Sequence, residues 1–493
     1  MSLQLSLCCP HYSWTTWGAL ESHCALAIQA MISASPIARR QRMLALTKGS
    51  ATSDSETHDD VAPYDGGDSL GTAFFWLTAF YFVYCARPHE IIPGLGKLPL
   101  AKLTSACALL SLAMSIGRAQ RRLSDLPREA YYLLAIITLL FLSAVLSPVW
   151  RGGAFFVTLD FAKVFILWLL GFLVITDEAR LRRIIFIQAS SVALISFIAL
   201  VKGHSVERLD SVVGGIYSNP NDLAFAIVLS MPFCLAFMLD STRVVAKVAW
   251  CFAMFVMVVA LLFTASRAGF LDLVISGVVC LWHLAVKGRR TYLIAISAIL
   301  GVVLLAVAGG KLKERFAAMG DNPTVESRSE ESAAESYEER RALITSSLDA
   351  IATHPLLGLG AQNFVVYSNM WREVHVSYLQ IAVEGGIPVL VLYLLFFQRG
   401  FANLRELRAR QLGVRTELFT GALHASLVGF VIGAAFAPQA YLYFPYLTVL
   451  YTSVLYAVVR QRASDQEQFS EVNKTQAMRK MRLYCGKAPL RST

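Results

Sequence analysis

Apolar stretches of about 20 residues follow one another from Leu70 onward, and short polar breaks separate them. A helix of that length crosses the roughly 30 Å of hydrocarbon in a bilayer. The chain is 56% hydrophobic and 16% charged, whereas a soluble domain carries about 25% charge. These features exclude a soluble enzyme and predict an all-α polytopic membrane protein. Twelve spans are predicted, near residues 70–86, 98–116, 129–147, 157–176, 184–202, 221–239, 247–264, 269–286, 291–310, 378–398, 418–437 and 443–459.

Lysine and arginine are concentrated in every second connection between the predicted spans. The basic connections lie in residues 118–128, 180–183, 243–247, 287–290 and 399–415. Cytoplasmic loops of membrane proteins carry such an excess of positive charge. The alternation therefore supports twelve spans with both termini in the cytoplasm. It also accounts for the net charge of +10 without nucleic acid as a partner.

Composition divides the chain into five parts. Residues 1–68 are an extension that we expect to be disordered and cytoplasmic, because its end is polar and acidic. Residues 69–310 hold spans one to nine, and residues 311–377 form one large outer loop. Residues 378–460 hold the last three spans, and residues 461–493 are a basic cytoplasmic tail.

The large outer loop has two halves of different character. An acidic run from Glu326 to Glu339 is expected to be mobile. After Arg340, the positions of Leu343, Leu348 and Ile351 have helical spacing. We expect this second half to fold against the membrane domain, because loops of such length are commonly functional.

Charged residues gather on the outer side of the predicted spans. Arg267 lies in a short loop, where a charge is costly unless an anion or an acid such as Asp272 is near. His375 precedes the tenth span and Glu384 lies in its first two turns, just before a break that Gly385, Gly386 and Pro388 predict. The other outer arginines considered are Arg208, Arg340 and Arg341.

This set of residues predicts recognition of a phosphorylated group beside one titratable base. Arginine side chains bind phosphate through two parallel hydrogen bonds and stay charged in partly dry sites. No metal-ligand spacing and no phosphate-binding glycine loop occurs in the sequence, so no metal or cofactor is expected. The segment Asn219 to Asp222 has the pattern of a turn and helix cap.

Four stretches resemble the O-antigen ligase/polymerase superfamily of bacterial envelope glycosyltransferases, and they occur in the family's order. They are SNPNDLA at 218–224, TASRAG at 264–269, THPLLGLGAQNF at 353–364 and HVSYLQIAVEGGIP at 375–388. The resemblance covers roughly residues 70–460 and implies a C-type glycosyltransferase-like membrane fold. It also implies that the family's loop histidine is His375, and that its outer arginines are Arg267 and Arg208.

The resemblance implies an enzyme of the bacterial inner membrane that transfers a glycan at the periplasmic face. The donor would be an undecaprenyl-diphosphate-linked glycan, and the acceptor a hydroxyl of lipid A–core, a polysaccharide or a protein. The transfer would be inverting and independent of metal. His375 is the expected general base with Glu384 as the second candidate, while Arg267, Arg208, Arg341 and Arg340 are expected to bind the diphosphate.

Two other functions remain open from the sequence. A polymerase of the same superfamily would use the same donor and a growing glycan as acceptor. A transporter of a small anion or saccharide also commonly has twelve spans, but it should show internal repeats with polar interruptions near mid-bilayer. The polar residues here cluster at one face, which favours the enzyme over the transporter.

Overall fold

The computed structural model describes residues 70–485 except 93, 116, 118–120, 203–208, 210–213, 215–216, 218, 300, 303–327 and 411. The chain divides into two units, Met1–Gly66 and Gly67–Thr493, and the described residues all belong to the second. They form helices and turns with no strand among them, as expected for an all-α protein. The N-terminal extension, and with it the expectation of disorder, lies outside the described residues.

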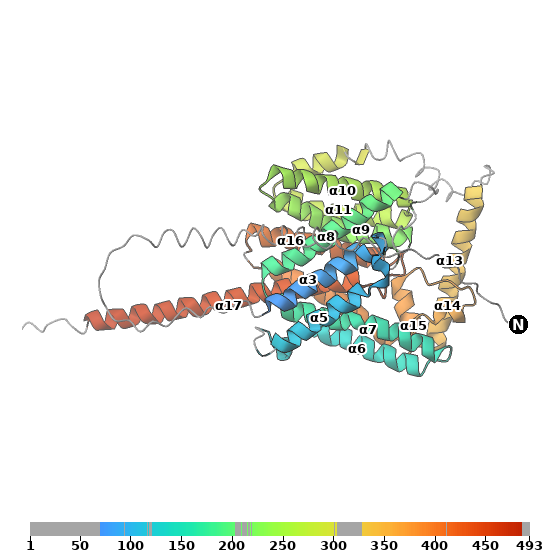
Figure 1. Cartoon of the computed structure of the whole chain (residues 1–493), viewed down its shortest axis with the longest axis horizontal. Helices are drawn as coiled ribbons and strands as arrows, with labels where there is room; N and C mark the ends of the chain where they lie inside the picture. Colours follow the sequence, from blue (N-terminus) through green and yellow to red (C-terminus); the bar gives the residue numbers. More distant parts are fainter. Residues whose placement is uncertain are drawn as a thin grey trace, which may run out of the picture. The chain divides into compact units, whose positions relative to one another are not determined.

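Figure 1 labels most of the helices of this unit. Their bounds are α3 (Gly71–Ala86), α4 (Pro88–Ile91), η1 (Leu95–Lys97), α5 (Leu100–Ser115), η3 (Leu123–Asp125), α6 (Arg128–Val145), α7 (Arg151–Val174), α8 (Glu178–Lys202), α9 (Pro220–Asp240), α10 (Val244–Thr264), α11 (Arg267–Leu281), η5 (Trp282–Lys287), α13 (Arg328–Thr353), α14 (Phe364–Tyr367), α15 (Ser377–Arg408), α16 (Val414–Gly433) and α17 (Tyr443–Cys485).

Most of the predicted spans coincide with apolar helices. Within the described residues, 8 helices are long and apolar enough to cross a membrane: α6 to α11, with η5 continuing α11, and α15 and α16. The spans predicted near 70–86 and 98–116 are the shorter apolar helices α3 and α5. The span near 443–459 is the first part of α17, and the span near 291–310 lies partly outside the described residues. A multi-pass membrane protein follows from these helices, while the number twelve stays a prediction.

The connections between consecutive helices alternate between two ends of the bundle. At one end, named the loop end, the Glu90 carboxylate accepts a hydrogen bond from the Gly214 backbone N–H at 2.6 Å. At the same end, Gln439 Nε2 donates to Asp222 Oδ1 at 2.7 Å. The loop end comprises the described residues of segments 87–99, 146–150, 203–219, 265–266, 354–376 and 434–442.

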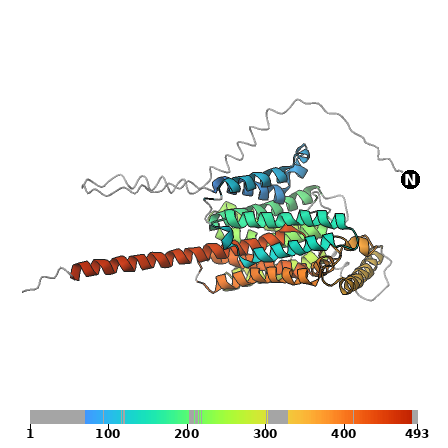
Figure 2. The same ribbon diagram turned by 90° about the horizontal axis from the view of Figure 1, so that it is seen from below.

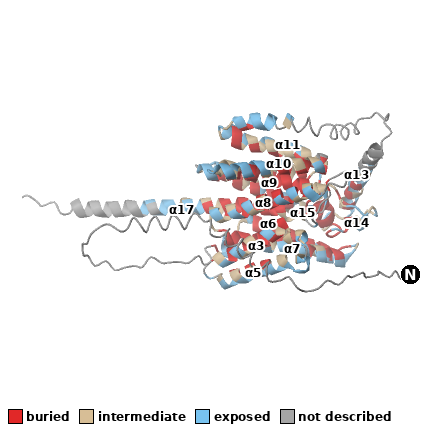
Figure 3. Ribbon diagram, turned by 45° about the horizontal axis from the view of Figure 1, so that its top comes forward, coloured by how far each residue is buried: buried red, intermediate tan, exposed pale blue. Residues whose placement is uncertain are grey.

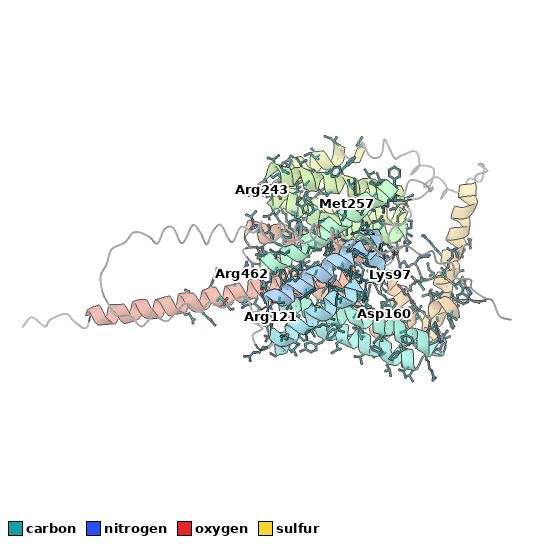
Figure 4. All side chains as sticks on the ribbon, viewed as in Figure 1. Lys97, Arg121, Asp160, Arg243, Met257 and Arg462 are labelled. Atoms are coloured by element: carbon teal, nitrogen blue, oxygen red, sulfur yellow. The ribbon has the colours of Figure 1, made fainter. Side chains whose placement is uncertain are left out.

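The opposite end, named the arginine end, holds the basic connections. Arg121 donates to the Phe172 and Ile175 carbonyls at 2.8 and 3.0 Å, and both Arg182 and Arg415 pair with the Asp240 carboxylate. Figure 4 shows Arg121, Arg243 and Arg462 toward this end, and Lys97 toward the loop end. The separation of the two ends agrees with the charge alternation in the sequence.

Helices α9 and α16 form the centre of the bundle. Their apolar windows are 78% and 72% buried, whereas the window of α10 is only 28% buried. Figure 3 shows buried residues concentrated where α8, α9 and α15 meet and exposed residues along α10. A helix exposed on one side and rich in apolar side chains is the form expected for contact with lipid.

The half of the outer loop after Arg340 packs on the loop end, as expected. Figure 2 shows α13 at one end of the bundle and the far part of α17 at the other. A separate apolar cluster joins this half to α15; its buried members are Leu343, Ala350, Leu359, Phe364, Val374 and Val383.

Two details of this loop differ from the sequence reading. Leu348 is 54% exposed, so the buried stripe of α13 runs through Leu343, Ser347 and Ala350 instead. Helix α13 begins at Arg328, so most of the acidic run is continuous with the folded half as one helix, which the sequence did not predict; its mobility stays a prediction.

The orientation of the bundle can be tested with reporter fusions. Fusions after Arg122, Arg183, Arg290 and Arg410 are expected to report a cytoplasmic position, because these residues lie in or beside basic connections. Fusions within residues 320–340 are expected to report a periplasmic one. A cytoplasmic signal from residues 320–340 would contradict the orientation on which the function rests.

Candidate active site

Helix α13 presents different faces to the bundle and to solvent. Leu343, Ser347 and Ala350 are 1%, 0% and 0% exposed, and Arg340 precedes them at the same helical spacing. Positions three and four residues apart lie on one face of a helix. The periodicity therefore places Arg340, which is itself exposed, at the end of the buried stripe of α13 and Arg341 on a neighbouring face.

His375 is half-buried just before α15 begins, and two exposed arginines, Arg340 and Arg372, lie near enough to act on its charge. Burial lowers its pKa below the ordinary value for histidine, and the positive charges of Arg340 and Arg372 lower the pKa further. Glu339 acts in the opposite direction, and its carboxylate pairs with Arg372 Nε at 2.6 Å. The side chain is therefore neutral near pH 7, the form in which an imidazole can accept a proton.

The break predicted in the tenth span occurs in α15, at Gly386, whose φ is 81° and ψ 173°. In an unbroken helix the Ile387 N–H would donate to the Val383 carbonyl, and Pro388 has no N–H to donate to Glu384. Here Ile387 donates to the Pro355 carbonyl at 2.8 Å instead. The break thus leaves two carbonyls of α15 in need of other donors.

The segment at 354–360 supplies those donors. The Leu359 and Gly360 N–H groups each donate at 2.9 Å, to the Val383 and Glu384 carbonyls respectively. Gly358 and Gly360 adopt φ values of 65° and 94°, which glycine accepts without strain. Two of the four stretches that resemble the family, 353–364 and 375–388, are therefore one structural unit, in which the loop completes the broken helix.

Asn363 fastens this unit to the membrane helices. It is 1% exposed, and its Nδ2 donates to Ser147 Oγ at 2.8 Å and to the Leu359 carbonyl at 2.9 Å. Since Ser147 follows α6, the loop is held on the bundle by buried polar contacts. A structural role explains this asparagine fully.

Glu384 lies deeper than His375, on the N-terminal side of the break. It is 2% exposed, and its carboxylate accepts a hydrogen bond from the Tyr441 hydroxyl at 2.6 Å. Ser143 Oγ donates to the Glu384 backbone carbonyl at 2.9 Å. No direct interaction joins the side chains of Glu384 and His375 among the described contacts, so the two candidate bases are separate groups.

A second group of polar residues at the loop end combines the predicted cap at residues 219–222 with Gln439, Gln362 and Glu373, which were not singled out in the sequence. Asp222 accepts from Asn219 Nδ2 at 2.6 Å as well as from Gln439. Glu373 accepts from Gln362 Nε2 at 3.3 Å, and burial together with the negative charge of Asp222 raises the pKa of Glu373. The helix-cap reading of Asn219 is confirmed, because its Oδ1 accepts from the Asn221 and Asp222 N–H groups.

The structure brings only part of the expected arginine set to His375. Arg340 lies near it, and Arg372 joins it without having been predicted from the sequence. Arg341 instead lines a groove on α13 with Glu338 and Asp349. Arg208 lies outside the described residues, and for Arg267 only the backbone is described, as the first residue of α11.

The proposed acid partner of Arg267 has no hydrogen bond among the described side chains. Asp272 is 1% exposed, and both of its carboxylate oxygens lack such a partner. The start of α11 is shaped by Ser266, whose Oγ accepts from the Gly269 N–H at 3.1 Å. In the described part of the chain, no three His, Cys, Asp or Glu side chains are placed to hold a metal ion.

The family model described as O-antigen ligase matches residues 252–394, from α10 to the middle of α15. The match supports the O-antigen ligase superfamily for this part of the chain. The O-antigen ligase match includes Arg267, all of α13, His375 and Glu384, and it indicates glycan transfer of the ligase/polymerase kind. No curated protein matches the chain.

Proposed function

We propose that this chain transfers a glycan from an undecaprenyl-diphosphate donor to a hydroxyl acceptor at the periplasmic face of the inner membrane. The observation that carries the proposal is His375, half-buried beside Arg340 and Arg372 within the matched O-antigen ligase region. A neutral base beside fixed positive charges suits a reaction in which a hydroxyl loses a proton and a diphosphate leaves. The acceptor would be lipid A–core, a polysaccharide or a protein.

The reaction proceeds in one displacement with inversion at the anomeric carbon. The acceptor oxygen forms a bond to that carbon while the bond to the diphosphate oxygen breaks, and the electron pair leaves with the diphosphate. A ring nitrogen of His375 takes the hydroxyl proton as general base. The arginines stabilise the negative charge that grows on the leaving group.

Four arginines are assigned to the diphosphate, two from their position beside His375 and two from the resemblance. Arg340 and Arg372 are the described arginines beside His375, and we assign them to the diphosphate. Arg267 and Arg208 follow as diphosphate ligands from the resemblance. Glu384 is 2% exposed and accepts a hydrogen bond from Tyr441. We assign it a structural role, holding the start of α15 in place, and no contact with the substrate.

The effect of Arg340 on His375 can be measured through pH. Activity falls as pH drops through the pKa of the base, because the protonated imidazole cannot accept a proton. Since Arg340 helps to lower that pKa, Arg340→Gln is expected to move the acid limb of the kcat/KM profile to higher pH. The matched control is Arg341→Gln, which removes the same charge from the next residue and is expected to leave the limb in place. Equal shifts in both variants would contradict the assignment.

The function itself is tested by reconstituting the full chain in vesicles with undecaprenyl-diphosphate-linked glycan and candidate acceptors. The expected product is a covalent glycan–acceptor conjugate of inverted anomeric configuration, formed equally well in excess EDTA. Movement of saccharide across the vesicle without a conjugate would indicate the transporter instead. Glycan lengthening without transfer to lipid A–core or protein would indicate the polymerase.

A further inference from the structure

A groove runs along the solvent side of α13, next to the candidate active site. Its lining residues recur at helical spacing and are joined by one aromatic ring from α14; they are Glu338, Arg341, Ala342, Thr345, Ser346, Asp349 and Tyr367. The same helix therefore carries Arg340 toward His375 on one face and this groove on an adjacent face. A molecule in the groove lies on the helix that borders the proposed base.

The side chains of the groove favour one class of ligand. Thr345, Ser346 and Tyr367 offer hydroxyls, while Arg341 donates and Asp349 accepts hydrogen bonds. Ala342 is the one wholly aliphatic side chain in this lining, so the groove has no continuous aliphatic strip for a lipid tail. A diphosphate would meet two carboxylates against one guanidinium, so an anion is disfavoured there.

Tyr367 adds a flat surface held in a fixed position. Tyr367 is 40% exposed, and its ring and the His354 ring are nearly perpendicular, with ring centroids 6.4 Å apart. Phe364, in the same short helix α14, is fully buried and anchors it. The ring presents a π face, whose negative quadrupole attracts the C–H face of a pyranose.

We propose that this groove binds the saccharide part of the acceptor, with Tyr367 stacked on one sugar ring and Arg341 and Asp349 bonded to its hydroxyls. The inference rests on the proposed function and names one substrate subsite of it. Arg341 then recognises the acceptor and not the diphosphate, contrary to the expectation from the sequence. Specificity among acceptors would then be set by side chains of α13 and Tyr367 that take no part in the chemical step.

The experiment measures saccharide binding with no donor present. The detergent-solubilised full chain is mixed with short oligosaccharides released by mild acid hydrolysis of the envelope polysaccharide, and binding is followed by saturation-transfer NMR. Tyr367→Ala is expected to weaken binding about tenfold, and Tyr367→Phe to retain most of it because the ring remains. Asp349→Ala, a change at an exposed position, should also weaken binding, by about fivefold.

Two controls separate this proposal from the proposed function. Leu348→Ala alters α13 outside the groove and should bind as the wild type does. His375→Gln should lose transfer yet bind the oligosaccharides normally, so a failure of the base assignment leaves the binding result intact. In transfer assays, Tyr367→Ala should raise the KM for the acceptor without changing kcat.

Unchanged binding in both Tyr367→Ala and Asp349→Ala overturns the proposal, as does the absence of oligosaccharide binding to the wild type. Preferential binding of a serine-rich peptide in the same groove also overturns it, because it would indicate a protein acceptor there. If Tyr367→Ala does not fold, the comparison of Asp349→Ala with Leu348→Ala decides the outcome.

Discussion

His375→Gln and His375→Ala are each expected to lower the rate of glycan transfer by roughly 10²–10⁴-fold, the usual cost of losing a general base. The acceptor hydroxyl is a weak nucleophile near neutral pH, and His375 is the half-buried titratable group beside two arginines at the loop end. Transfer is measured with saturating donor and acceptor in vesicles, so that the loss reports the chemical step.

The same variants should keep donor binding, because the arginines remain in place. His89→Gln is the matched control, since His89 also lies at the loop end but beside Glu90, and it should retain activity. Near wild-type transfer by His375→Gln would mean that the histidine positions a substrate at most. Glu384 would then be the next candidate base.

Gly386→Val is expected to abolish folded protein in the membrane. The residue has a φ of 81° and a ψ of 173°, a region that is essentially restricted to glycine and costs about 1–3 kcal/mol for other residues. A Cβ at this position would also lie 2.4 Å from the Leu356 carbonyl oxygen, a backbone atom that cannot move aside cheaply. Strain and overpacking together are expected to cost about 3–5 kcal/mol.

The measurement is the amount and thermal stability of the solubilised protein, compared with a second glycine variant. Gly277, inside α11, has no atom within 4 Å of an added Cβ, so Gly277→Ala should leave folding intact or improve it by up to about 1 kcal/mol. If Gly386→Val accumulates like the wild type, the complementary fit between the loop and the helix break is wrong.

The sequence predicted the break in α15 but not the segment that packs into it. Two glycines and a proline within four residues, Gly385 to Pro388, indicate a bend through local backbone chemistry alone. The partners of the freed carbonyls, Leu359 and Gly360, come from a loop whose position depends on tertiary packing. Local sequence therefore indicates that a helical turn is interrupted. The segment that supplies the replacement hydrogen bonds is known only from the folded structure.

The site was predicted in part for a similar reason. His375 and Arg340 could be named from the residue types. Which of Arg340 and Arg341 lies near His375 depends on which face of α13 packs on the bundle, and the structure was needed to show that. Apolar Leu348 suggested the wrong phase, because the buried position next to it is the polar Ser347. The pairing of Asp222 with Gln439 joins residues far apart in the chain, and no sequence spacing indicates it.

The order of segments along the chain has a consequence for the biogenesis of this protein. A helix with two unsatisfied carbonyls would cost several kcal/mol for each on entering hydrocarbon. The segment that donates hydrogen bonds to the Val383 and Glu384 carbonyls precedes α15 in the chain. Its N–H groups are therefore already synthesised when α15 leaves the ribosome. A nascent chain can therefore close the break as it inserts. If the protein were expressed as two fragments divided between residues 360 and 377, the second fragment would insert with both carbonyls unsatisfied. The cost would persist until the first fragment bound to it.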